Sequence, residues 1–122
     1  MEASDIFLGN DLVEVSRILS SIDIIGQRFI DRIYTIHEQD YCNSKSKPEV
    51  HYAGRFAAKE AIIKALKSSG YKQPTPFHSI EIKSGDGGEP IVNLHFPCDG
   101  QCRVSISHTE NHAIASAIFI SE

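Results

Sequence analysis

Apolar residues crowd segment 55–66 and predict that it forms the middle of the longest helix in the chain. Alanines and straight-chain residues fill the segment, no Pro or Gly interrupts it, and Gly70 follows near the expected end. Glu60 and Lys64 stand one turn apart within it. At helical spacing the apolar residues fall on two sides, and they are Phe56, Ala57, Ala58, Ala61, Ile62, Ile63, Ala65 and Leu66. We therefore expect a helix that is packed on both sides and also carries a carboxylate and an ammonium group.

The N-terminal pattern predicts a strand followed by a helix. Alternating apolar residues place the strand over 6–15. Within it, Gly9 and Asn10 both tolerate unusual backbone angles, so we expect a bulge or a sharp bend there. From residue 16 the apolar residues recur at helical spacing, with a break at Gly26.

The second half of the chain alternates between apolar and polar residues and predicts hairpins. It follows a short helix over 37–44 and the long helix, which we expect over 48–69 because Pro48 suits a first helical position. The predicted strands are 77–83, 90–96, 103–108 and 113–120, with turns at 84–88 and 109–111. Helices followed by hairpins are typical of an α+β fold, here an antiparallel sheet packed on one long central helix and shorter helices.

Length, charge and cysteine content limit the kinds of protein that this chain can be. A chain of 122 residues suits one domain, 1–122, with a single core. No apolar run is long enough to span a membrane, and the acidic start over 1–5 predicts no signal peptide. The formal net charge of −4 gives no support to nucleic-acid binding. The cysteines are too few for a disulfide framework, which favours a reducing cytoplasm, and they are Cys42, Cys98 and Cys102.

Glu60 and Lys64 leave two interpretations open. In the simpler one, they form an i,i+4 ion pair that supports the helix weakly. In the other, Glu60 binds a cation and Lys64 contacts an anion bound to that cation. The helix alone favours the first interpretation, and residues elsewhere in the chain are needed to choose between the two.

Histidines and cysteines near the C-terminus support a rival hypothesis, in which the protein is a small zinc-binding structural module. They are His95, Cys98, Cys102, His108 and His112. Against this rival, the sequence has no C-x2-C knuckle, and buried free cysteines usually act as small hydrophobic residues. A serine hydrolase is also disfavoured, because Ser107 and His108 are adjacent in a predicted strand and point to opposite sides.

Three segments, taken together, closely resemble the holo-[acyl-carrier-protein] synthase family, the small 4'-phosphopantetheinyl transferases. The segments read GNDLVEVSRI at 9–18, GRFAAKEAIIKA at 54–65 and SISH at 105–108. They occur in the family's order and span almost the whole chain. One departure is Asn10, which replaces the usual apolar residue before the aspartate and changes no ligand.

The resemblance implies both a fold and a reaction. Members of this family move 4'-phosphopantetheine from coenzyme A to a serine of apo acyl carrier protein in fatty acid biosynthesis, leaving adenosine 3',5'-bisphosphate. Its metal-binding acids fall on Asp11 and Glu60, which would hold Mg2+. The implied catalytic residues are Glu60, Lys64 and His108. The residues leave open whether Glu60, Lys64 or a metal-bound water removes the serine proton, and we favour Glu60, directly or through water.

The resemblance also implies two binding surfaces and an assembly. The candidate coenzyme A contacts are Lys64, His108, Arg55, Lys45 and Lys47. Docking of the acidic carrier protein needs a basic surface, for which the candidates are Arg17, Arg28 and Arg32. Short members of the family are homotrimers with active sites between subunits, so we expect the second apolar side of the long helix at a subunit boundary. Besides the zinc module, a Mg2+-dependent coenzyme A pyrophosphatase remains an alternative.

Overall fold

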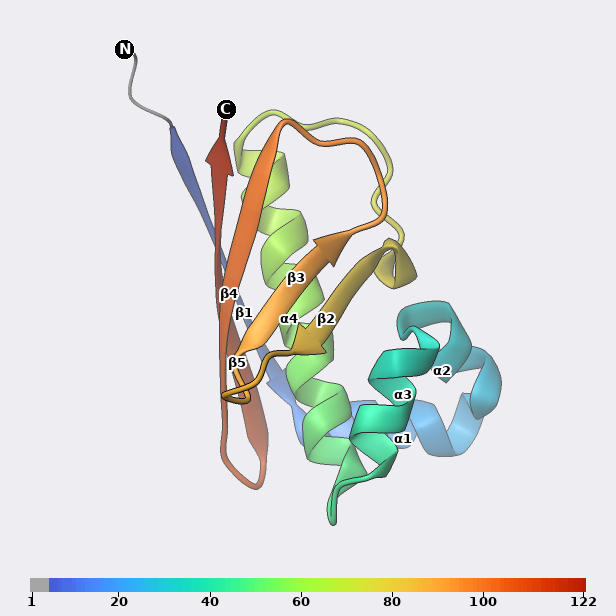
Figure 1. Cartoon of the computed structure of the whole chain (residues 1–122). Coiled ribbons are helices and arrows are strands. Elements are labelled where there is room, and N and C mark those ends of the chain that lie inside the picture. The colour runs from blue at the N-terminus through green and yellow to red at the C-terminus, as the bar shows by residue number, and fades with distance from the viewer. Residues whose placement is uncertain (1–4) are drawn as a thin grey trace.

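The computed structural model describes residues 5–122, so the acidic start discussed above lies outside the described residues except for Asp5. Figure 1 shows a long central helix between a sheet on one side and shorter elements on the other. The elements are β1 (Ile6–Glu14), α1 (Val15–Ile25), α2 (Gln27–Ile33), α3 (Ile36–Asn43), α4 (Pro48–Ser68), the 3-10 turn η1 (Phe77–Ser79), β2 (Ile80–Ser84), β3 (Pro90–Leu94), β4 (Gly100–His108) and β5 (His112–Ser121). Among the described residues, no helix has both the length and the apolarity to cross a membrane.

Helix α4 packs on a three-stranded antiparallel sheet with the strand order β1-β5-β4. The central strand β5 alternates exposed positions with the buried residues Ala113, Ala115 and Ala117. These small side chains let the sheet approach the alanine-rich side of α4, where Ala57 and Ala61 are fully buried. The predicted α+β class is confirmed.

The predicted bulge at Gly9 and Asn10 is wrong. Strand β1 pairs with β5 without interruption through the whole described strand, from Ile6 opposite Ile120 to Glu14 opposite His112. Gly9 is needed for a different reason, because a Cβ atom there would lie 2.0 Å from the backbone oxygen of Ala61. The glycine therefore allows close approach of the strand to α4 rather than a bend.

The helical segments largely follow the predicted pattern. The break at Gly26 is confirmed, since this residue separates α1 from α2 and adopts a positive φ of 79° that favours glycine. Helix α3 begins with a capping box in which Thr35 and Glu38 satisfy each other's backbone N–H groups. Residues 77–79 form a 3-10 turn instead of the expected strand, because both the backbone N–H and the hydroxyl of Ser79 bond the carbonyl oxygen of Pro76.

The hairpins form two sheets rather than one. Strands β2 and β3 pair only with each other in the described chain, and β3 runs beside β4 without joining its sheet (Figure 1). Alternation along a strand reports which face is buried but not which strand is its neighbour. The single antiparallel sheet expected from the sequence is therefore corrected to a three-stranded and a two-stranded sheet.

The second side of α4 is covered in part by the same chain. Ile62 and Leu66 are buried in the core, whereas Phe56 and Ile63 are half-buried. Phe56 stacks on Phe77 with ring centroids 5.2 Å apart. Packing on both sides is thus confirmed, while a subunit boundary along α4 stays a prediction.

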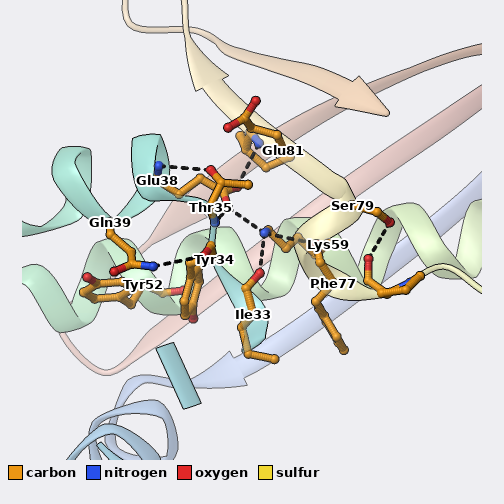
Figure 2. A network of polar contacts seen from close by, with 12 residues as sticks. Ile33, Tyr34, Thr35, Glu38, Gln39, Tyr52, Lys59, Phe77, Ser79 and Glu81 are labelled. Carbon is orange, nitrogen blue, oxygen red and sulfur yellow. Dashed lines mark hydrogen bonds and ion pairs between the residues drawn. The ribbon is translucent and has the colours of Figure 1, made fainter. Parts of the chain in front are cut away.

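A buried polar cluster ties the short helices to α4 (Figure 2). The ammonium of Lys59 donates to Glu38 Oε1 at 2.6 Å, to the carbonyl oxygen of Ile33 at 2.6 Å and to that of Phe77 at 3.2 Å. The other carboxylate oxygen of Glu38 accepts from the backbone N–H of Ile82 at 2.8 Å. One ion pair therefore links the end of α2, the start of α3, helix α4, η1 and β2.

Candidate active site

Two carboxylates from different elements meet in one pocket. Asp11 comes from β1 and Glu60 from the middle of α4, and both line a cavity of about 390 Å³. Arg17 of α1, Phe29 of α2 and Phe56 of α4 form part of its walls. The structure thus brings together the two acids that the sequence predicted as metal ligands.

Electrostatics set Glu60 apart from an ordinary surface carboxylate. Burial, and then the nearby charge of Asp11, raise the pKa of Glu60, while Lys64 and Lys67 act in the opposite direction. Two carboxylates that lie close together repel each other, and a cation placed between them removes the repulsion. This arrangement fits a cation site.

Lys64 does not pair with Glu60 in the described chain. Its ammonium instead donates to Asp11 Oδ1 at 3.1 Å and to the backbone oxygen of Asn10 at 2.9 Å. The Lys64 side chain remains 51% exposed while that of Asp11 is only 15% exposed. The simple i,i+4 ion pair is therefore wrong, because the close approach of β1 offers Lys64 better partners across the site.

The donor set matches Mg2+ better than zinc. Among residues 5–122, no group of three or more His, Cys, Asp or Glu side chains is arranged to hold a metal ion. A structural zinc site needs four such ligands, whereas Mg2+ commonly takes one or two carboxylates and completes its shell with water and substrate phosphate. Asp11 and Glu60 provide those two carboxylates.

The residues proposed for the rival zinc module do not act together in the structure. His95 Nε2 lies 3.1 Å from Glu81 Oε1, across the β2–β3 hairpin. Cys98 and Cys102 are free thiols, and burial raises the pKa of Cys102 to about 12. Among residues 5–122, these side chains are not gathered into one group of ligands.

A second cluster surrounds Arg55 in a pocket of about 200 Å³. The Arg55 guanidinium stacks 3.8 Å above the ring centroid of Tyr41, and Lys45 lies over the same ring at 4.7 Å. His51 and His108 also line the space, with their ring centroids 5.6 Å apart. The cluster therefore gathers Arg55, Lys45 and His51 around the ring of Tyr41, with His108 beside His51.

Arg55 is buried with little to balance its charge. Only 6% of the residue is exposed, its Nε has no hydrogen-bond partner, and one terminal nitrogen donates to Ser84 Oγ at 3.2 Å. No carboxylate pairs with it among the described residues. Because a buried guanidinium without an anion is costly, this pocket fits an anionic ligand.

The two pockets do not share a lining residue. Arg55 and Glu60 are five residues apart on α4, which places their side chains about 140° apart around the helix axis. The structure therefore brings Asp11, Glu60 and Lys64 together, and separately Arg55, Lys45 and His108. It does not bring His108 to the two carboxylates within one chain.

The other predicted site residues lie on the surface. Lys47 is 3.7 Å from Glu110 in an exposed ion pair and does not line the Arg55 pocket. Arg17 is exposed at the rim of the carboxylate pocket, whereas Arg28 and Arg32 are exposed on α2. The predicted docking arginines thus extend from the carboxylate pocket onto the neighbouring short helix.

Sequence reasoning missed His51 and Tyr41 as pocket residues. His51 precedes Arg55 by one helical turn, so the i,i+4 spacing could have placed both on one side of α4. Tyr41 carries no comparable signal, because its place beside Arg55 depends on how α3 packs on α4.

Known proteins resemble this chain in sequence and in fold. The family described as ACPS, the 4'-phosphopantetheinyl transferase superfamily, matches residues 7–117. The holo-[acyl-carrier-protein] synthase of Protochlamydia amoebophila is 39% identical over 119 residues, covering 93% of this chain and 97% of that protein. The synthase of Chlorobaculum tepidum is 42% identical over 113 residues, with 92% and 96% covered. A crystal structure of the Bacillus anthracis synthase in complex with CoA (3',5'-ADP) has a TM-score of 0.81 and 30% identity, covering 98% of this chain and 100% of that one.

These similarities extend over nearly the whole chain. They confirm the resemblance drawn from segments 9–18, 54–65 and 105–108, and they agree with the observed α+β arrangement. The chain is an enzyme that belongs to the 4'-phosphopantetheinyl transferase superfamily.

Proposed function

We propose that the protein is a holo-[acyl-carrier-protein] synthase of fatty acid biosynthesis. It moves 4'-phosphopantetheine from coenzyme A to a serine of apo acyl carrier protein and releases adenosine 3',5'-bisphosphate. The observation that carries the proposal is the pocket shared by Asp11 and Glu60, with Lys64 bonded to Asp11 at its edge. The coenzyme A bound by the Bacillus anthracis relative supports the choice of donor.

Asp11 and Glu60 would hold Mg2+, which supplies charge neutralisation to the pyrophosphate of coenzyme A. The two carboxylates come from a strand and a helix that are packed tightly against each other, so their spacing is fixed before substrate binds. Lys64 lies beside them with an exposed ammonium that can contact a phosphate oxygen. This chain therefore contributes two ligands and one further positive charge.

Proton transfer accompanies the attack of the serine. The serine oxygen forms a bond to the phosphorus that carries pantetheine, and the bond from that phosphorus to the oxygen of adenosine bisphosphate breaks. Glu60, directly or through a water, accepts the serine proton. Lys64 stabilises the charge that moves to the leaving group.

The pocket around Arg55 would receive the other end of coenzyme A. Arg55 and His108 line this pocket, and Lys45 lies over the ring of Tyr41, another lining residue. The buried guanidinium has no carboxylate partner in the described chain. A phosphate group suits this site in size and charge. Lys47 stands outside the pocket and would act only at longer range.

Separation of the two pockets supports a homotrimer in which each active site combines residues of two subunits. The outer face of the three-stranded sheet carries exposed apolar side chains suited to burial between copies, and they are Ile6 (61% exposed), Leu8 (67%), Leu12 (65%) and Ile114 (46%). Their positions are aligned across the sheet, with Ile6 opposite Ile120 and Leu12 opposite Ile114. A single continuous domain, 1–122, would form each subunit.

Acyl carrier protein would dock beside the carboxylate pocket on the basic surface of α1 and α2. Arg17 lies at the pocket rim, and Arg28 and Arg32 extend the surface. Carrier proteins are generally acidic, so complementary charge would raise the rate of productive encounter. The three free cysteines are compatible with the reducing cytoplasm, where we place the reaction.

The activity is tested with purified protein, coenzyme A, Mg2+ and apo acyl carrier protein, followed by intact mass measurement of the carrier. Addition of one phosphopantetheine group, dependent on Mg2+, is the expected result. Failure to modify a carrier that a known synthase does modify would overturn the proposal. Release of phosphopantetheine in the absence of carrier would instead identify a coenzyme A pyrophosphatase.

The shared site has its own test. An Asp11→Ala chain and a His108→Ala chain, each impaired alone, are refolded together and assayed. Activity should partly return, because some interfaces in the mixed assembly combine an intact carboxylate pocket with an intact Arg55 pocket. A mixture no more active than its parts would contradict sharing between subunits.

A further inference from the structure

We propose that His51 is a further coenzyme A-binding residue, and that it takes up a proton when the 3'-phosphate binds beside it. The inference rests on the proposed function and adds to it a residue and a pH dependence. It follows from the position of His51, the charges around it and the size of the pocket.

His51 lines the pocket around Arg55 and contacts two other residues of its wall. Its ring meets Tyr41 edge-on at 5.7 Å between centroids and His108 at 5.6 Å. It stands on α4 one turn before Arg55, and it is half-buried. Two imidazoles and a guanidinium therefore line the same space of about 200 Å³.

The size and charge of this space select one part of coenzyme A. A volume of about 200 Å³ suits a phosphate group better than a whole nucleotide. The 3'-phosphate is a phosphomonoester with nearly two negative charges at neutral pH, whereas each phosphate of the pyrophosphate carries one. A buried Arg55 with Lys45 and two histidines matches the more highly charged group.

The groups around His51 favour its neutral form when no anion is present. Burial lowers its pKa first, followed by His108 of β4, Lys45 after α3 and Arg55 of α4, and only Glu49 of α4 opposes them. Tyr41 of α3 contributes a ring edge, and Ser84 of the hairpin an uncharged hydroxyl. Without a bound anion, His51 is therefore favoured as the neutral imidazole, which can still accept a proton.

A bound phosphate reverses the balance. Its negative charge favours the imidazolium form of His51, so the pKa of His51 rises on binding. Linkage then requires that protons are taken up with the ligand and that affinity increases as the pH falls from 8 towards 6.5. Below about pH 6 the phosphate itself gains a proton, which ends the increase.

Calorimetry with two ligands tests the inference. Coenzyme A and dephospho-coenzyme A, which lacks the 3'-phosphate, are titrated at pH 7 into the full-length protein with Mg2+, in two buffers of different ionisation enthalpy. Wild-type protein should take up protons with coenzyme A and fewer with the dephospho form. His51→Phe, which keeps an aromatic ring in the stack, should bind coenzyme A about 10-fold more weakly, as expected for loss of one charge-assisted hydrogen bond.

The second ligand, the transfer assay and a control variant test separate parts of the proposal. The His51→Phe variant should bind dephospho-coenzyme A as wild type does, and in the transfer assay it should show a raised KM for coenzyme A with an unchanged kcat. His78→Phe, an exposed histidine on η1, serves as the matched control and should change nothing. Unchanged proton uptake and affinity in His51→Phe would overturn this inference alone. Failure of wild-type protein to bind coenzyme A would overturn both it and the proposed function.

Discussion

Lys59 and Glu38 form an ion pair in which neither side chain has any exposed surface, with Nζ and Oε1 2.6 Å apart. Such pairs often add little stability, because removing two charges from water costs about as much as their attraction returns. Here the pair also satisfies backbone groups of Ile33 and Phe77 (Figure 2). It accepts as well from the backbone N–H of Ile82. Its main consequence is therefore the relative placement of the elements that surround α4.

Substitution of one partner should be severe. Lys59→Met leaves the Glu38 carboxylate buried without its cation, and we expect the free energy of unfolding to fall by about 3–5 kcal/mol. Urea denaturation followed by circular dichroism measures the change. Lys67→Met, on the exposed side of the same helix, should shift stability by no more than about 0.5 kcal/mol. A loss in Lys59→Met as small as in this control would contradict the role of the pair.

Glu60→Gln should separate activity from stability. Transfer should fall about 100-fold or more, since metal-supported charge neutralisation is worth several kcal/mol. The metal-free variant should nevertheless melt at a slightly higher temperature at pH 7.5. The folded-state pKa of Glu60 is raised above the ordinary 4.5, so its favourable contribution exists below pH 4.5 and is lost as the pH rises through the folded pKa.

Differential scanning fluorimetry with EDTA checks the stability half of this prediction at pH 4 and pH 7.5. The gain from Glu60→Gln should be present at the higher pH and disappear at the lower one, where the wild-type carboxyl is already protonated. A variant that is less stable than wild type at pH 7.5 would contradict the repulsion between Glu60 and Asp11.

Arg28→Ala should weaken the encounter with the carrier protein. Arg28 is exposed on α2 and lines neither the carboxylate pocket nor the Arg55 pocket. We expect the KM for carrier protein to rise about 3- to 10-fold, as for other charges at the rim of an interface, with the KM for coenzyme A unchanged. Lys72→Ala, an exposed charge after α4, is the control. Equal increases in both KM values would argue against docking at α2.

Gly9→Ala should be destabilising although it adds one methyl group. The new Cβ would meet the backbone oxygen of Ala61 at 2.0 Å and the backbone nitrogen of Ala65 at 2.7 Å, and backbone cannot move aside cheaply. A loss of about 1–3 kcal/mol in unfolding free energy is expected. Gly87→Ala, in the exposed hairpin turn, faces only a flexible glutamate side chain and should cost far less. Similar losses in the two variants would show that the strand can retreat from α4.

Leu8→Asp should disrupt the proposed assembly. Leu8 is exposed on the outer face of the sheet, so the substitution should leave the fold of a single chain intact. Burial of an unpaired carboxylate between copies would be costly, and light scattering should report a lower molar mass. Ile24→Asp, an exposed apolar residue on α1, controls for the change in charge. An unchanged mass for Leu8→Asp would place the interface elsewhere.

Local pattern was sufficient for most elements, but not for the chemistry of the main pocket. The long helix, the break at Gly26 and the hairpins follow from periodicity and turn residues, which act within a few positions. Asp11 and Glu60 were assigned to one site only through the resemblance of the chain to a family. They are 49 positions apart in the sequence, and no local rule relates them.

Long-range packing accounts for what sequence reasoning missed. Gly9 suggested a bend because glycine is flexible, whereas its actual role depends on how closely α4 lies against β1. The Glu38–Lys59 pair and the stack of Tyr41 on Arg55 likewise join segments that meet only in the folded chain. The division into two sheets depends on strand partners, which alternation does not encode.

Small residues between β1, β5 and α4 have a consequence for motion. At Gly9 the backbone of β1 lies directly against the backbone of α4 at Ala61, so the strand cannot slide along the helix there without a clash. Thermal fluctuation in the separation of Asp11 from Glu60 should therefore be small, even before a cation binds. The two ligands proposed for the cation would therefore be close to their bound positions before it arrives, and little ordering entropy would be lost when the site fills.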